Sequence, residues 1–179
     1  MVKKIETDKE KLLLGVISDT HIPSESKSIP DRVIKDFKEK KIDYLLAVGD
    51  YTTFEAYESI VNAFGDEKVF AVLGNMDSDV KLQETLPETI EIEVLGHRIF
   101  MIHGGGSPHF IVNRLKKKHD LSECDIVVFG HTHHPFNQEK DGKLFINPGS
   151  VNDKRFTDVN SYGYLHVSKE KVEFEIVTL

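Results

Sequence analysis

The chain has 179 residues, of which 30% are charged and 39% hydrophobic, and its formal net charge is −7 at pH 7. No apolar run approaches the roughly 20 residues of a membrane span, and the acidic balance disfavours steering onto nucleic acid. The single cysteine, Cys124, excludes an internal disulfide and agrees with a reducing compartment. We therefore expect a cytoplasmic protein with a single domain over residues 1–179, in which residues 1–11 form a polar leader.

Short apolar runs rich in β-branched and aromatic residues predict buried strands. In the first half of the chain these runs alternate with helical segments. This βαβ order implies parallel pairing and right-handed crossovers. The expected strands cover residues 12–17, 44–48 and 69–73, and the expected helices run from about 30 to 40 and from 54 to 63.

The second half of the chain favours hairpins. Residues 89–94 and 98–102 alternate apolar and polar side chains around a Gly turn, which is typical of a hairpin with one wet face. Two further hairpins are expected at residues 136–146, around Asp141-Gly142, and at 162–177. With a helix at about 108–118 and a strand at 126–129, the pattern predicts two packed sheets with helices outside.

Five short polar clusters are the main functional signal, because each closes an apolar run of strand length. In open α/β sheets the carboxyl ends of the strands form the rim where substrates bind. The clusters therefore predict a site at this rim with enough oxygen and nitrogen ligands for two metal ions. They are Asp19-Thr20-His21, Gly49-Asp50, Gly74-Asn75-Met76-Asp77, His103-Gly104 and Gly130-His131-Thr132-His133.

The ligand types narrow the choice of metal. Asp19 and His21 are two residues apart, so strand-like geometry would send both side chains to one face, and His131 and His133 repeat the spacing. Asp50 is the natural bridge, since a carboxylate has enough lone pairs for two cations. Imidazoles and carboxylates without a thiolate favour a divalent transition metal. We take manganese as the first expectation, with nickel, iron, cobalt or zinc as alternatives.

In this order and spacing, the clusters resemble those of the calcineurin-like metallophosphoesterase superfamily. Asn147-Pro148-Gly149-Ser150 matches a further stretch that is usual in its small prokaryotic phosphodiesterase branch. The resemblance implies an α/β fold, a four-layer αββα sandwich of two mixed sheets flanked by helices. It also implies two metal ions per chain, one held by Asp19, His21, Asp50 and His133 and the other by Asp50, Asn75, His103 and His131.

The activity that the resemblance implies is phosphoester hydrolysis, in which a hydroxide bridging the two metals attacks phosphorus. The general acid is not assigned, and Asp77, a water or a metal-bound group are the candidates. The expected catalytic residues are Asp50, Asn75 and His103, and the expected substrate contacts are Asn75, Gly104 and His134.

Two positions depart from many members of the family. Tyr51-Thr52-Thr53 follows Asp50 where many members have an arginine that grips the phosphate, and Met76 follows Asn75 where many have a histidine. Without an arginine, two cations neutralise a singly charged diester more readily than a doubly charged monoester. We therefore expect a phosphodiesterase. If monoesters prove to be preferred, Lys27 and Arg155 are the first candidates for a cationic grip.

Two alternatives stay open at this stage. One is a phosphomonoesterase that acts on small phosphorylated metabolites. The other is a non-catalytic protein-binding scaffold, because the same fold resembles the retromer scaffold subunit. The expected partner is a small phosphoester substrate, with no membrane and no stable nucleic-acid partner, and a homodimer is a further expectation.

Overall fold

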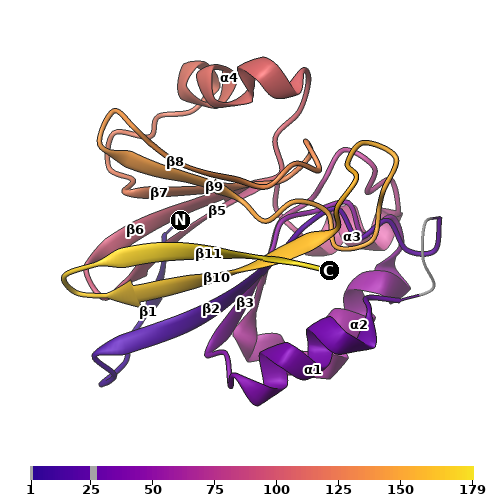
Figure 1. Cartoon of the computed structure of the whole chain (residues 1–179), viewed down its shortest axis with the longest axis horizontal. Coiled ribbons are helices and arrows are strands. Elements are labelled where there is room, and N and C mark those ends of the chain that lie inside the picture. The colour runs from indigo at the N-terminus through magenta and orange to yellow at the C-terminus, as the bar shows by residue number, and fades with distance from the viewer. Residues whose placement is uncertain (1, 25–27) are drawn as a thin grey trace.

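Two β-sheets face each other and helices cover their outer faces, so the fold has four layers (Figure 1). The computed structural model describes residues 2–24 and 28–179. Helix α4 (Ile111–Lys118) packs outside one sheet, and α1 (Asp31–Glu39) and α2 (Phe54–Phe64) pack outside the other. This is the predicted αββα arrangement. Within the described residues, none of the helices combines the length and apolarity that crossing a bilayer requires.

The six-stranded sheet has the order β1-β5-β6-β7-β9-β8. Its central strands β6, β7 and β9 are parallel, while β5·β6 and β8·β9 are the two expected antiparallel hairpins. The strands are β1 (Val2–Ile5), β5 (Thr89–Val94), β6 (His97–Ile102), β7 (Ile126–Phe129), β8 (Phe136–Lys140) and β9 (Lys143–Asn147).

The five-stranded sheet has the order β11-β10-β2-β3-β4. The parallel core β2-β3-β4 comes from the βαβ half of the chain, and β10 pairs antiparallel with both β2 and β11. The parallel core and the β10·β11 hairpin follow the sequence expectation, whereas the pairing of β10 with β2 was not predicted. The strands are β2 (Lys11–Ile17), β3 (Tyr44–Ala47), β4 (Val69–Ala71), β10 (Ser161–Ser168) and β11 (Val172–Thr178).

The apolar runs of the central strands are continuous because each strand faces two cores. Along β2, Leu14 and Val16 pack between the sheets, while Leu13 and Ile17 pack against the helices. In the other sheet, Met101 packs between the sheets and Phe100 packs under α4. Side chains that alternate between two dry faces leave no polar periodicity in the sequence.

The structure also contains elements that the sequence analysis did not predict. The segment treated as a polar leader includes β1, which pairs parallel with β5 and places Ile5 in the core between the sheets. A short helix, α3 (Val80–Thr85), begins where Asp79 accepts hydrogen bonds from two backbone N–H groups. Two 3₁₀ turns, η1 (Asp66–Lys68) and η2 (Pro108–Phe110), precede β4 and α4 respectively.

The carboxyl ends of β3, β4 and β6 come so close together that only a glycine fits at one point. Gly49 has φ 86°, and a Cβ there would lie 2.7 Å from the Gly74 backbone nitrogen and 2.8 Å from His103 Nδ1. Gly96, in the turn between β5 and β6, has φ 87° but open space around its Cβ position. Both glycines adopt a positive φ that would strain any other residue, and they differ in the space around the Cβ position.

Replacing Ile5 with alanine tests whether β1 is an integral part of the sheet. We expect Ile5→Ala to lower the free energy of unfolding by about 2 kcal/mol, because it opens a gap between the sheets. Val2, which is 38% exposed on the same strand, is the control, and Val2→Ala should change stability by less than about 0.5 kcal/mol. Equal effects of the two changes in chemical denaturation would contradict the packing of β1.

Gly49→Ala and Gly96→Ala separate backbone strain from steric overlap. Both substitutions force a side chain into the left-handed region, which costs about 1 kcal/mol or more. Gly49→Ala should destabilise by at least about 2 kcal/mol more than Gly96→Ala, because its Cβ meets backbone that cannot move. Thermal and chemical unfolding of the two variants measure the difference, and equal losses would be inconsistent with the close approach.

Candidate metal centre

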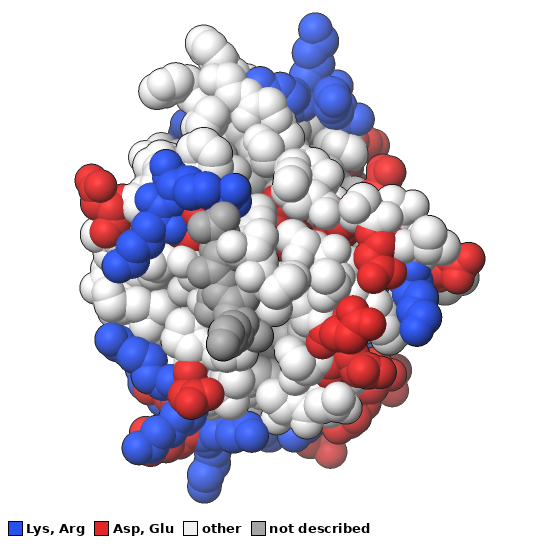
Figure 2. Space-filling view, turned by 90° about the vertical axis from the view of Figure 1, so that its right-hand side faces the viewer, with Lys and Arg blue, Asp and Glu red and all other residues white. Residues whose placement is uncertain are grey.

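The five polar clusters lie together at the carboxyl ends of the parallel strands, as predicted. The loops that follow these strands lie on the right-hand side of Figure 1. Seen from that side, uncharged residues occupy most of the centre of the face and charged side chains gather around its margins (Figure 2). Most of the charge-bearing groups of the site are buried.

Two groups of three side chains have ligand atoms within 4.8 Å of one another: Asp19, His21 and His133, and Asp19, Asp50 and His103. All five residues are buried. His133 Nε2 lies 3.1 Å from Asp19 Oδ1 and 3.3 Å from His21 Nε2. Asp50 Oδ2 lies 3.6 Å from His21 Nε2 and 3.3 Å from His103 Nε2, so this oxygen stands between the two groups.

The backbone fixes one oxygen of each carboxylate and leaves the other facing the histidines. Asp19 Oδ2 accepts hydrogen bonds from the Ser18 hydroxyl (2.6 Å) and from the His131 backbone N–H (3.0 Å). Asp50 Oδ1 accepts one from the Met76 backbone N–H (2.8 Å). Both carboxylates are thus oriented before any ligand binds.

Asp19 and His21 face the same centre, as expected, but not through strand-like geometry. Both residues have left-handed backbone, with φ 54° for Asp19 and 45° for His21. The Asp19 N–H donates to Gly49 O and the His21 N–H donates to Asp50 O, so the segment is held against the loop after β3. A tight turn, not strand periodicity, aims these two side chains at Asp50.

The backbone orients the ring of His103 for metal binding. Its Nδ1 lies 2.6 Å from the Val48 carbonyl oxygen, to which it donates, so the lone pair of the neutral ring resides on Nε2. Burial alone would lower the pKa of His103, but the charges of Asp19 and Asp50 raise it to about 9. Burial alone would raise the pKa of Asp19, but His103, His133 and His21 hold it well below its usual value.

Asn75 and His131 form a pair beside these groups. His131 Nδ1 lies 2.8 Å from Asn75 Oδ1, a separation suited to two ligands of one ion, and Nε2 lies 3.0 Å from the Gly106 carbonyl oxygen. Burial and the neighbouring His103 lower the pKa of His131, which favours its neutral form. His131 belongs to neither of the two clusters of three in the described part of the chain.

The residues present fit a bound cation. Among the described residues, Asp19 Oδ1 and His103 Nε2 are buried polar atoms without a hydrogen-bond partner. Leaving such atoms unsatisfied costs about 1–3 kcal/mol each, and both face the carboxylate and imidazole groups around them. A divalent metal ion would satisfy them.

Two pockets open from this centre and meet at Asn75. One, of about 420 Å³, is lined by His21, Asp50, Asn75, Met76, Pro108, His131, Thr132, His133, His134, Arg155 and Phe156. The other, of about 740 Å³, contains Gly104 together with polar side chains such as Ser78, Gln83 and Glu88. His134 and Gly104, both expected to contact substrate, therefore lie on different sides of Asn75.

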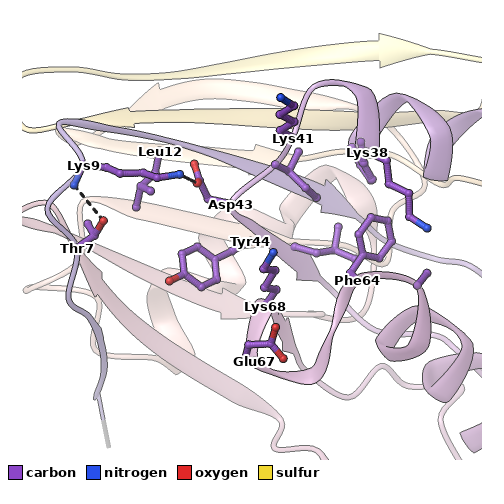
Figure 3. Close-up of a pocket in the computed structure, with 14 residues that line it drawn as sticks. Thr7, Lys9, Leu12, Lys38, Lys41, Asp43, Tyr44, Phe64, Glu67 and Lys68 are labelled. Carbon is purple, nitrogen blue, oxygen red and sulfur yellow. Dashed lines mark hydrogen bonds and ion pairs between the residues drawn. The ribbon is translucent and has the colours of Figure 1, made fainter.

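A further pocket, of about 730 Å³, lies at the opposite end of the five-stranded sheet, where β2 and β3 begin (Figure 3). Lys9, Lys38, Lys41 and Lys68 are among its lining residues, and Lys9 pairs with Asp43. A lysine ammonium has no lone pair for a metal. The chemistry therefore identifies the strand-end pockets, and not this one, as the candidate site.

Two of the three candidate residues for the general acid and the cationic grip, Asp77 and Arg155, lie among the described residues. Asp77 accepts hydrogen bonds from the backbone N–H groups of Asp50 (3.0 Å), Thr52 (2.7 Å) and Gly74 (2.7 Å), so it braces the loops that carry ligands. Arg155 lines the smaller pocket and makes a two-point ion pair with Asp153. Lys27 lies outside the described residues.

Asp153 is the site residue that the sequence analysis missed. It is fully buried, and its Oδ2 lies 3.3 Å from His133 Nδ1 and 3.7 Å from His21 Nε2. The signal was the Asn147–Ser150 stretch just before it. Ser150 Oγ donates to Asp19 O (2.7 Å) and accepts from Asp153 N (2.8 Å), so this stretch connects Asp153 with the loop after β2.

Comparisons with known proteins agree with this geometry. Residues 12–170 match the model of the calcineurin-like phosphoesterase superfamily domain. A probable metallophosphoesterase of Methanothermobacter thermautotrophicus is 32% identical over 166 residues, which cover 93% of this chain and 92% of the relative. A phosphodiesterase of Methanocaldococcus jannaschii is 25% identical over 170 residues, with 88% and 95% coverage.

Among solved structures, zinc-bound Vps29 from Entamoeba histolytica superposes with a TM-score of 0.71 at 26% identity, covering 93% of this chain and 99% of that one. The fold, the strand-end ligands and the matched relatives lead to one conclusion. The chain belongs to the calcineurin-like phosphoesterase superfamily.

Proposed function

We propose that the protein is a phosphodiesterase with two divalent transition-metal ions per chain. The observation that carries this proposal is the position of Asp50 Oδ2, 3.6 Å from His21 Nε2 and 3.3 Å from His103 Nε2. Asp50 Oδ1 already accepts the Met76 N–H, so Asp50 would offer Oδ2 to the ions. One ion would be held by Asp19, His21, Asp50 and His133, and the other by Asp50, Asn75, His103 and His131.

The chain's own residues orient both the ions and the substrate. His103 presents Nε2 because Val48 O holds its Nδ1–H, and Asp19 presents Oδ1 because two donors hold its Oδ2. Two bound ions would supply a nucleophile from water at neutral pH and neutralise the phosphoryl oxygens. Asn75 belongs to both pockets, so its side chain would contact substrate and metal together.

Two features of the pockets favour diesters over monoesters. A diester carries two organic groups, and two pockets that differ in polarity meet at Asn75, where the phosphorus would lie. Arg155 is the permanently charged cation among the residues that line the smaller pocket, and Asp153 already neutralises it. The site therefore lacks the additional positive charge that a monoester dianion requires. The name of the phosphodiesterase relative supports the same assignment.

The second candidate function is a protein-binding scaffold, which the similarity to Vps29 favours. That structure contains zinc, so bound metal by itself does not distinguish a scaffold from an enzyme. Hydrolysis does. A metal-loaded protein that cleaves no phosphoester would support the scaffold and contradict the proposed activity.

The first prediction from this centre concerns metal stoichiometry. We expect two manganese ions per chain after loading, and Asp50→Asn should weaken the binding of both, because Asp50 is the shared ligand. Asn75→Ala is the comparison, since it removes one neutral oxygen from one ion. It should reduce the stoichiometry to about one and leave the other ion in place. Elemental analysis after gel filtration measures both variants.

The opposite order of metal loss in these two variants would contradict the assignment of Asp50 as the shared ligand. If Asp50→Asn retained two ions while Asn75→Ala lost both, Asp50 Oδ2 would not be the shared ligand. A wild-type protein that never binds more than one ion would contradict the dinuclear centre itself.

The second prediction concerns the substrate. With manganese bound, kcat/KM for methyl 4-nitrophenyl phosphate should exceed that for 4-nitrophenyl phosphate by at least about tenfold near neutral pH, because the site lacks a free cationic grip. The two substrates share a leaving group, so the comparison reports the charge and the second organic group. A preference for the monoester would overturn the diester assignment.

A further inference from the structure

The carboxylate of Asp153 lies directly behind the imidazole of His133. Asp153 is fully buried, and its Oδ2 lies 3.3 Å from His133 Nδ1, on the side of the ring away from Asp19. Among the described residues, His133 Nδ1 makes no regular hydrogen bond, although it is buried. Asp153 Oδ2 is thus an acceptor beside a buried ring nitrogen that lacks a hydrogen-bond partner.

Asp153 is itself held on two sides. Its backbone N–H donates to Ser150 Oγ (2.8 Å), and Arg155 binds both carboxylate oxygens, with Nε 3.0 Å from each. The guanidinium of Arg155 also donates through Nη2, 2.6 Å from Oδ2, and this two-point pairing is the geometry of an ionised carboxylate. A fixed, charged acceptor of this kind can orient a neighbouring ring.

The opposite side of the His133 ring faces the metal centre. His133 Nε2 lies 3.1 Å from Asp19 Oδ1. The ring of Phe156 packs edge-to-face with the His133 ring, with 5.1 Å between the centroids. A neutral imidazole carries one proton, so a proton held on Nδ1 leaves the lone pair on Nε2. Histidine ligands typically depend on such a partner for their orientation and basicity.

We propose that Asp153 is a positioning residue that holds the His133 proton on Nδ1 and so directs Nε2 toward the metal centre. The proposal rests on the proposed function, because it assumes that His133 is a ligand. It also gives the loop after β9 a role in metal affinity in addition to its role in the pocket wall. Ser150 holds the Asp153 backbone in place, and Arg155 pairs with its carboxylate.

Metal affinity tests the proposal without any assay of activity. We expect Asp153→Ala to weaken Mn²⁺ binding by about 10- to 100-fold in calorimetric titration, and Asp153→Asn to have an intermediate effect because the amide oxygen still accepts a hydrogen bond. Arg155→Met is the matched control. It removes the partner but keeps the carboxylate, so Mn²⁺ affinity should stay within about twofold or increase, since a positive charge is lost.

A second readout follows the His133 proton directly. In the zinc-loaded protein, ¹H–¹⁵N spectra of the histidine rings should report a protonated Nδ1 for His133 in the wild type. The hydrogen-bonded shift of that proton should be lost in Asp153→Ala and retained in Arg155→Met. A role confined to loop structure would not produce this separation. Melting temperatures of the metal-free proteins control for folding, and if Asp153→Ala does not fold, the pair Asp153→Asn and Arg155→Met decides.

The outcomes distinguish a failure of the proposed function from a failure of the positioning role of Asp153. If the wild type fails to bind Mn²⁺, the proposed function fails together with this inference. If the wild type binds Mn²⁺ but folded Asp153→Ala binds it equally well, the positioning role alone is overturned. If Arg155→Met loses as much affinity as Asp153→Ala, the integrity of the loop matters and the carboxylate does not.

Discussion

The structure depends on two carboxylates buried side by side. Asp19 and Asp50 are 0% and 2% exposed, and their oxygens lie within 4.8 Å of each other and of His103 Nε2. Two negative charges this close repel each other strongly in a medium of low dielectric constant. The fold can keep both carboxylates here only because imidazoles and backbone N–H groups surround them. The negative charges of Asp19 and Asp50 also stabilise the protonated form of His103, which raises its pKa to about 9.

Gathering ligands so tightly requires unusual backbone. Asp19, His21, Asp50, His131 and His133 all have positive φ, between 45° and 66°. Such conformations cost about 1–3 kcal/mol each for residues with a side chain, and they persist because neighbouring groups hold them. Asp77 accepts three backbone N–H groups from the loops after β3 and β4, and Ser150 holds the loop after β2. The strain is therefore concentrated at the strand ends, where the ligands lie.

The strands and the clusters of candidate ligands could be predicted from the sequence, because each is encoded in a short stretch of the chain. The strands are continuous apolar runs, and each ligand cluster directly follows one, so the rim of the sheet and the clusters on it follow from order alone. β1 could not be predicted in this way. Of its four residues only Ile5 is buried, and its pairing with β5 joins segments more than 80 residues apart.

The same distinction applies to the site. The proposed ligands stand in recognisable pairs, whereas Asp153 has no motif of its own, and its contacts with His133 and Arg155 exist only in the folded chain. The left-handed backbone at five proposed ligands was equally invisible, since none of these residues is glycine. Tertiary contacts determine both the position of Asp153 and the left-handed backbone, so the local sequence does not reveal them.

In the proposed function, the loop after β9 would connect metal affinity with substrate preference. Asp153 faces His133, while Arg155 and Phe156 line the smaller pocket next to Met76. The ion pair between Asp153 and Arg155 therefore cancels a positive charge at the pocket while supplying a negative one to the metal centre. A neutral residue in place of Asp153 would change both effects, because Arg155 would lose this ion-pair partner and His133 would lose an acceptor. In the proposed function, the ligands at the strand ends would carry the reaction, and a single loop would adjust which phosphoester enters.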